Sequence, residues 1–269
     1  MRIPKKVWRI TALKVFSVFA LDNFPLIKSG DNIAEIIVES TRENGLKIED
    51  GDVIAIAQKI VSKAEHRVLA LKDVFPSKKA KEIAKITYKS SRFVELVLRE
   101  SKNVVKASRE ILLVEDKRGF VCINAGIDKS NVQGKGKFAL LPENPDESME
   151  KYRVEIKKLT GKNVILVMTD TYSRPFRRGQ VNFAIGAAGI NPFRDYRGKK
   201  DLFRQMLKVK NVAIIDEIAA AAELLMGQAK EAVPVVIFKG LNRIIESCDK
   251  CSINELQISN EEDLFKDAL

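Results

Sequence analysis

Residues 163–171, NVILVMTDT, decide the fold class of this 269-residue chain. Residues 163–168 form the clearest strand pattern in the sequence, because an apolar run rich in β-branched side chains favours a strand. We expect this strand to end at residues 169–171, which are Thr, Asp and Thr. Asp170 is therefore expected at the end of an apolar strand, where a carboxylate either caps a helix or holds a metal ion.

Helices and strands alternate on both sides of this strand. A helix over residues 146–159, closed by Gly161, precedes it. A strand over 212–215 follows and runs into Asp216, the expected cap of a helix over 217–226, and the last strand covers 233–238. Toward the N-terminus, the apolar alternation at Leu13, Val15 and Val18 indicates a strand. A helix is then expected after Asn32 and a strand over Val53–Ala57. Two helices follow, from Pro76 to about Tyr88 and around Phe93, and then two strands over 110–114 and 119–123. This alternation predicts an α/β or α+β protein with mixed sheets and leaves the sheet order open.

The composition excludes several classes of chemistry. The single histidine, His66, excludes HExxH zinc sites and His-ligated di-iron centres. Neither GxxxxGK[ST] nor GxGxxG occurs, so the chain lacks the P-loop and the Rossmann fingerprint. No stretch reaches the roughly 18 apolar residues of a membrane-spanning helix, which predicts a soluble protein.

The three cysteines are too few for a disulfide framework and predict a reducing, cytoplasmic location. Cys248 and Cys251 form a CxxC pair near the C-terminus. The pair is either part of a zinc site or, as we favour, incidental, because only Cys122 and His66 remain to complete four zinc ligands.

The chain is basic, with 47 Lys and Arg against 36 Asp and Glu and a net charge of +11. Residues 101–200 carry most of the excess, and their densest basic group is Arg174, Arg177, Arg178, Arg194, Arg197, Lys199 and Lys200. Such a group suits either a nucleic acid or a small polyanion, and charge alone does not choose between them.

Four polar loops carry the candidate chemistry. Residues 123–131 gather Asn, Asp and Ser oxygens of the kind that Mg²⁺ and Mn²⁺ prefer, although the same residues also form ordinary turns. Residues 170–180 place Asp170 beside three arginines, which is either a phosphate or carboxylate clamp or a solvated basic loop. Residues 58–63 supply lysines that suit phosphate, and residues 226–231 form a glycine-containing loop between a helix and a strand.

Six motifs that include these loops occur in order along the chain. They are FPLI (24–27) with Gly30-Asp31, AQKIVSKAE (57–65), NAGIDKSNV (124–132), TDTYSRPFRRGQVNFAIGAAGI (169–190), DYRGKKDL (195–202) and DEIAAAAELLMGQ (216–228). Together they resemble the coenzyme F420-0:L-glutamate ligase (F420 γ-glutamyl ligase) family over about residues 22–245. The tail at 261–265 also resembles the end of that family.

The resemblance implies a GTP-dependent ligase that joins L-glutamate, in successive additions, to the carboxylate of coenzyme F420-0. GDP and phosphate are released through an acyl-phosphate intermediate. The family fold is its own α/β arrangement, in an intertwined homodimer that needs Mg²⁺ or Mn²⁺ at two sites and is helped by K⁺. For this chain it implies one unit over residues 1–269, with a motif-bearing core at about 22–245 and a C-terminal extension at 246–269.

Site residues follow from the matching motifs. The implied catalytic residues are Asp128, Asp170 and Arg177, with Arg177 in the arginine group that would hold the acceptor or the glutamate. The metal ligands would be Asp128 and Asp170 at one ion and Thr171 and Gln228 at a second. The residues expected to surround GTP are Phe24, Pro25, Leu26, Ile27, Gln58, Lys59, Lys63, Asn131, Met226, Gly227, Gln228 and Ala229.

Several residues depart from the family pattern. Lys230 and Ala232 stand where an acidic residue and a glycine are usual, and a lost glycine can forbid a positive φ. The choice of GTP over ATP therefore stays open. His66 replaces a usual glycine and is expected in an exposed loop, and Tyr172-Ser173 replace Phe-Gly beside the metal-binding aspartate.

Three alternatives to this ligase stay open. A paralogue would join an amino acid to a different acceptor. A basic nucleic-acid-binding protein is disfavoured because no recognisable module or basic–aromatic interleaving accompanies the charge. A non-catalytic relative is disfavoured because Asp128 and Asp170 are intact.

Overall fold

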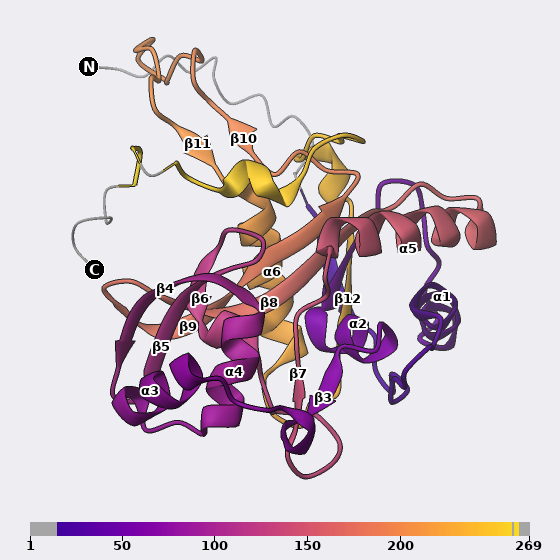
Figure 1. Ribbon diagram of the computed structural model, residues 1–269. Coiled ribbons are helices and arrows are strands. Elements are labelled where there is room, and N and C mark those ends of the chain that lie inside the picture. Colours follow the sequence, from indigo (N-terminus) through magenta and orange to yellow (C-terminus); the bar gives the residue numbers. More distant parts are fainter. Residues whose placement is uncertain (1–14, 260, 264–269) are drawn as a thin grey trace.

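A five-stranded mixed sheet forms the centre of the molecule (Figure 1). The computed structural model describes residues 15–259 and 261–263. The strands follow the spatial order β1 (Ser17–Ala20), β12 (Val235–Lys239), β2 (Val53–Ala57), β8 (Ile165–Arg174) and β9 (Arg177–Ala188). Only β2 and β8 pair in parallel, in register from Val53 opposite Ile165 to Ala57 opposite Thr169.

Both faces of this sheet are buried, because successive strand residues point to opposite sides. Ile54, Ile56 and Leu166 pack in one core with α1 (Ile33–Glu43), α2 (Gln58–Ala64) and α5 (Pro145–Thr160). Val53, Val167 and their neighbours pack in a second core against α6 (Ile214–Met226). The sheet is therefore enclosed between two helical layers, as the continuous apolar runs of β2 and β8 require.

A smaller unit of two helices and three antiparallel strands packs around a third core. It consists of α3 (Lys78–Thr87), α4 (Ser91–Arg99), β4 (Ser101–Ser108), β5 (Ile111–Asp116) and β6 (Val121–Ile123). Two short strands, β3 (Val68–Ala70) and β7 (Lys137–Ala139), connect it to the main body. Strand β6 contacts β8, so this unit reaches the central sheet near Asp170.

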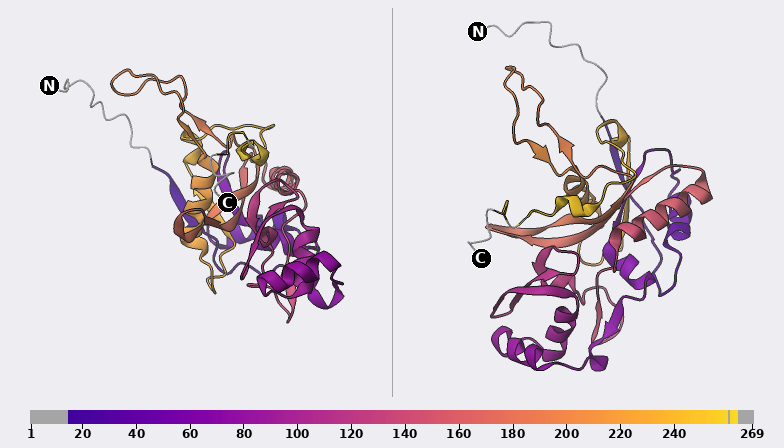
Figure 2. Two further views of the ribbon diagram at one scale, coloured as in Figure 1. Left: turned by 60° about the vertical axis from the view of Figure 1, so that its left-hand side comes forward. Right: turned by 45° about the horizontal axis from the view of Figure 1, so that its top comes forward.

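A two-stranded arm leaves the main body at residues 194–212 (Figures 1 and 2). Its base is the pair β10 (Arg194–Asp195) and β11 (Asn211–Val212). Further backbone hydrogen bonds join its two sides toward its end. The remaining elements are short 3₁₀ turns at Leu71–Asp73, Asn124–Gly126, Leu241–Arg243 and Ile253–Leu256.

The α+β class with mixed sheets is confirmed, and three local predictions are wrong. Strand β8 does not end at residues 169–171: it continues to Arg174 because β9 pairs with it along that whole length, so Asp170 lies within the strand. The strand over 212–215 is shorter, because α6 begins at Ile214. Asp216 lies in the first turn of that helix, not at its cap, and its Oδ1 accepts the Ala184 N–H at 3.0 Å.

The cysteine prediction is also wrong in part. Cys248 and Cys251 form a disulfide, because the chain turns between them and brings their Cα atoms to 5.6 Å. Cys122 is free and buried. The predicted alternation at Leu13 and the motif residues Leu264 and Phe265 lie outside the described residues. Within the described part of the chain, no helix is both long and apolar enough to cross a membrane.

Candidate functional site

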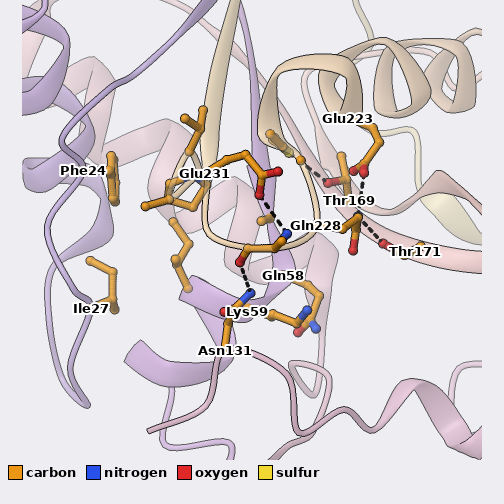
Figure 3. Close-up of a pocket in the computed structure, with 18 of the residues that line it drawn as sticks. Phe24, Ile27, Gln58, Lys59, Asn131, Thr169, Thr171, Glu223, Gln228 and Glu231 are labelled. Atoms are coloured by element: carbon orange, nitrogen blue, oxygen red, sulfur yellow. Dashed lines mark hydrogen bonds between the residues drawn. The ribbon is translucent and has the colours of Figure 1, made fainter.

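A cavity of about 260 Å³ opens at the carboxyl ends of the parallel strands β2 and β8. This edge of a parallel pair is where α/β proteins bind ligands, because the chain leaves the sheet there and its polar loops converge. Helix α2 starts directly after β2, and residues 227–234, between α6 and β12, form the facing wall. The lining combines the apolar segment 24–27 with lysine, amide and carboxyl side chains (Figure 3).

All twelve residues expected around the nucleotide line this cavity. They come from four segments that are far apart in sequence: 24–27, 58–63, 131 and 226–229. The four segments therefore line one cavity, while the assignment of these residues to a nucleotide site stays a prediction.

Three polar contacts join the loops of the cavity. The Lys59 ammonium lies 2.9 Å from Asp128 Oδ2 and 2.8 Å from Ser130 Oγ. Asn131 Nδ2 donates to the Ala229 carbonyl oxygen at 3.2 Å (Figure 3). Burial, followed by repulsion from Lys59, lowers the pKa of Lys63. Two neighbouring lysines in the lining favour an anionic ligand.

A network of oxygen-bearing side chains crosses from β8 to the end of α6 (Figure 3). Gln228 Nε2 donates to Thr171 Oγ1 at 2.8 Å and to Glu223 Oε1 at 2.7 Å. Thr171 Oγ1 in turn donates to Asn182 Oδ1 at 2.8 Å. The predicted pair Thr171 and Gln228 is therefore in contact, and Glu223 Oε2 and Gln58 Nε2 remain buried without a hydrogen-bond partner among the described residues.

Asp128 and Asp170 differ in how their charges are satisfied. Burial raises the pKa of Asp128, but hydrogen bonds from Ser130 and the Lys59 ammonium outweigh it and hold that pKa below its ordinary value. Burial raises the pKa of Asp170 to about 7, against the opposing effects of Lys59 and Arg118, and Asp128 adds to the rise. Asp170 forms no ion pair with any residue that the structure describes.

These donors fit a divalent cation that is shared with a bound ligand. A cation beside Asp170 would favour the charged carboxylate that burial disfavours. Within residues 15–259 and 261–263, no three Asp, Glu, His or Cys side chains form a metal site by themselves. Mg²⁺ is commonly held by one or two carboxylates together with substrate phosphates and water, which matches this donor set.

The arginine group predicted from sequence does not form one surface. Arg177 and Arg178 are exposed at the β8–β9 turn. Four other members, Arg194, Arg197, Lys199 and Lys200, belong to the arm at residues 194–212, which projects elsewhere (Figure 2). The two sets are separated because β9 runs the length of the sheet between them. Arg177 lines neither this cavity nor any other described here, so its catalytic role stays a prediction.

Two residues that replace a usual glycine of the family have the positive φ that glycine favours. Ala232, in the wall of the cavity, has φ 56°, and His66 has φ 60°. Replacing glycine therefore did not abolish the left-handed conformation, contrary to the concern that Ala232 would forbid it. His66 is exposed, as predicted, and its Nδ1 contacts Ser29 Oγ. Lys230 is exposed, and Glu231 Oε2 accepts the Ala229 N–H at 2.7 Å.

Comparisons with known proteins support the motif assignment. The sequence model of the F420-0:Gamma-glutamyl ligase family matches residues 23–240, a span that includes every residue lining the cavity. The chain is 46% identical over 220 residues to the coenzyme F420:L-glutamate ligase of Methanocaldococcus jannaschii, covering 81% of this chain and 85% of that protein. It is 44% identical over 252 residues to the protein of the same name from Archaeoglobus fulgidus, covering 94% and 97%. The corresponding protein of Methanothermobacter thermautotrophicus is 42% identical over 224 residues, covering 83% and 88%.

Proposed function

The chain belongs to the F420-0:gamma-glutamyl ligase family, and from this membership we propose that it joins L-glutamate to the carboxylate of coenzyme F420-0 by an amide bond. The observation that carries the proposal is that all twelve motif-derived nucleotide contacts line one cavity inside the span of the family match. Relatives that share 42–46% of their residues over most of the chain bear the name of this ligase.

The cavity is proposed to hold GTP. Phe24 and Ile27 form an apolar wall that suits a base or ribose, and Lys59 and Lys63 supply positive charge for phosphates. Glu231, beside them, is an acceptor for the N–H groups of guanine, which adenine presents differently. The Glu231 carboxylate is our reason for preferring GTP over ATP.

The reaction needs an activated carboxylate, because a free carboxylate does not condense with an amine in water. The γ-phosphoryl group of GTP passes to a carboxylate oxygen of F420-0, its bond to the β-phosphate breaks, and GDP and an acyl phosphate result. The amine of L-glutamate then attacks the acyl carbon, loses a proton and expels phosphate. Positioning and electrostatic stabilisation are sufficient for such steps, so the absence of a second histidine is no obstacle.

Asp128 and Asp170, with Thr171 and Gln228 nearby, are proposed to hold Mg²⁺ or Mn²⁺, assisted by K⁺. A divalent ion bound there would neutralise charge on the phosphoryl oxygens. The residues of the chain contribute alignment: Lys59 orients Asp128, and Gln228 links Thr171 to Glu223 by donating a hydrogen bond to each.

The working form is proposed to be a homodimer. The arm carries Leu202 and Phe203 with 92% and 78% of their surface exposed, on a hairpin that projects from its own chain (Figure 2). Exposed apolar side chains gathered at one place on a protein indicate an interaction surface.

Mass spectrometry of a ligation reaction tests the proposed function. Purified protein is incubated with F420-0, L-glutamate, GTP and Mn²⁺, and the acceptor is expected to gain one or more glutamyl residues while GDP accumulates. Parallel reactions with ATP in place of GTP, and without metal, test the two finer claims. Absence of any glutamyl product with authentic F420-0, across Mg²⁺ and Mn²⁺, would refute the activity.

A further inference from the structure

A second cavity, of about 270 Å³, lies between the small unit and the main body. Six charged side chains line it: Arg67, Glu100, Asp116, Lys117, Arg118 and Glu143. Three are positive and three are negative, and they form ion pairs with one another: Arg67 with Glu100 and Glu143, Lys117 with Glu100, and Arg118 with Asp116. The cavity therefore presents both signs of charge to one small volume. None of the six belongs to the motifs by which the nucleotide and metal residues were assigned.

Arg118 is held rigidly with part of its hydrogen-bonding capacity unused. Its side chain is 11% exposed, and its Nε and Nη2 atoms donate to Asp116 Oδ2 at 2.9 and 2.5 Å. The Nη1 atom is buried and has no hydrogen-bond partner among the described residues. A buried guanidinium N–H without an acceptor is unfavourable, so this atom is available to an anionic ligand group.

A strained turn forms part of the cavity wall. Asn124, Ala125 and Gly126 adopt φ values of 56°, 54° and 68°, three left-handed residues in succession. Ala125 lines the cavity and is almost fully buried, and the side-chain oxygen of Asn124 is buried without a described partner. Left-handed conformations of non-glycine residues are unfavourable and are concentrated at binding sites.

Arg118 also connects this cavity to the first one. Its Nη2 atom lies 3.3 Å from the Tyr172 hydroxyl. Tyr172 is two residues from Asp170 on β8, so the two side chains share a face of the strand, and Asp170 lines the first cavity. A small molecule beside Arg118 would therefore lie next to the carboxylate end of the candidate active site.

We propose that this second cavity binds the incoming amino acid, L-glutamate, with a carboxylate on Arg118 Nη1 and Lys117 and with the ammonium group facing Glu100 and Glu143. The assignment rests on the ligase activity proposed above. An amino acid carries both signs of charge, as the cavity does, whereas the polyanionic F420-0 has no ammonium group to place against Glu100 and Glu143.

Arg118→Lys tests the proposal, because lysine keeps the charge but loses the fixed planar donors. Arg153→Lys is the matched control: Arg153 is also largely buried and acid-paired, with Glu150, but it lies outside the cavity. We expect Arg118→Lys to raise the KM for L-glutamate by at least about tenfold while the KM values for GTP and F420-0 stay within about twofold. Arg153→Lys is expected to leave all three unchanged.

Isothermal titration of L-glutamate provides a readout that does not require turnover. The unaltered chain is expected to bind glutamate, and Arg118→Lys to bind it at least about tenfold more weakly. If Arg118→Lys does not fold, Lys117→Gln replaces it, since the Lys117 side chain is 62% exposed and can be changed without burying a new group. A rise of about threefold in the KM for glutamate is expected for that variant.

The outcomes separate this inference from the proposed activity. If ligation proceeds but the variants leave the KM for glutamate unchanged, or raise that for F420-0 instead, the amino-acid site is refuted and the ligase is not. If no ligation occurs, weaker glutamate binding by Arg118→Lys than by Arg153→Lys still supports the cavity assignment. Equal glutamate binding by both variants would refute it.

Discussion

Asp170 is the less compensated of the two aspartates that are proposed to hold a metal ion. Its carboxylate is enclosed beside β6 and forms no ion pair with a described residue, while Asp128 adds a second negative charge nearby. Folding an uncompensated carboxylate into such a position is unfavourable, and structures retain one there for a function.

We expect Asp170→Asn to remove activity without loss of stability. The neutral amide keeps the shape of the side chain but no longer attracts a cation, so turnover should fall by at least about 100-fold. The melting temperature should be unchanged or higher, because a buried charge is lost. Ligation kinetics and thermal unfolding measure the two effects. Asp195→Asn, on the exposed base of the arm, is the control and should retain activity. A large fall in melting temperature for Asp170→Asn would show that Asp170 is structural.

Ala232 offers a test of backbone strain in the cavity wall. At φ 56° an alanine side chain crowds its own backbone, whereas glycine does not. Ala232→Gly should therefore stabilise the protein by about 1 kcal/mol, measured by urea unfolding. Ala229→Gly, in the same loop but without a positive φ, should destabilise it, because glycine adds entropy to the unfolded chain. Equal changes in the free energy of unfolding for the two substitutions would show that the positive φ of Ala232 does not destabilise the protein.

Sequence reasoning identified twelve cavity residues from the ordered motifs but assigned no role to two others, Glu223 and Asn182, that lie in the same motifs. Glu223 follows a run of alanines in α6 and Asn182 precedes an apolar stretch of β9, so neither carries a local signal of its contacts. Arg118 looks like one basic residue among many. Its fixed position arises only in the folded protein, where its guanidinium contacts Asp116 and also Tyr172, which is 54 residues away in sequence.

The β8–β9 hairpin and helix α6 together position the site. The apolar run predicted the start of β8, but its polar second half continues as a strand because β9 pairs with it out to Arg174. The start of α6 was misplaced for a related reason: Ile214 and Ile215 are β-branched, yet both are buried against the sheet as the first helical residues. Tertiary packing decided both boundaries against local preference.

Asp216 fixes α6 to β9, and its ionisation should be visible in the stability of the whole protein. Burial raises the pKa of this carboxyl above its ordinary value, against the opposing hydrogen bond from the Ala184 N–H. The folded state then binds the Asp216 proton more tightly than the unfolded state. This contribution to the free energy of unfolding therefore decreases as the pH rises from the ordinary carboxyl pKa through the raised one.

Asp216→Asn should abolish this part of the pH dependence and increase stability at neutral pH. The asparagine Oδ1 can still accept the Ala184 N–H, so the link between α6 and β9 is retained. Urea unfolding at a series of pH values from 4 to 7 measures the change. Glu217→Gln, on the exposed side of the same turn, is the control for the lost charge and should leave the profile unchanged. A lower stability of Asp216→Asn at neutral pH would contradict the argument.

On the scale of the whole molecule, the two cavities lie on either side of the place where the small unit meets the central sheet. The first is built from β2, β8 and α6, and the second from β5, the 124–126 turn and residues that connect the two parts. Sequence patterns could not predict this, because the small unit contains β4, a mostly polar strand whose longest apolar run is the pair Val104 and Val105. Its position depends on the third core, which forms only when α3, α4 and β5 come together.

The arm provides the last prediction, which concerns assembly. Leu202 and Phe203 lie at its end with 92% and 78% of their surface exposed, and burial against a second copy would remove this apolar area from water. We expect the unaltered chain to sediment as a dimer and the Leu202→Asp/Phe203→Asp variant as a monomer over the same micromolar range in analytical ultracentrifugation. Phe75→Asp is the control, because Phe75 is 77% exposed but belongs to the small unit. A dimer that survives the double substitution, or that dissociates equally with Phe75→Asp, would show that the arm does not hold two copies together.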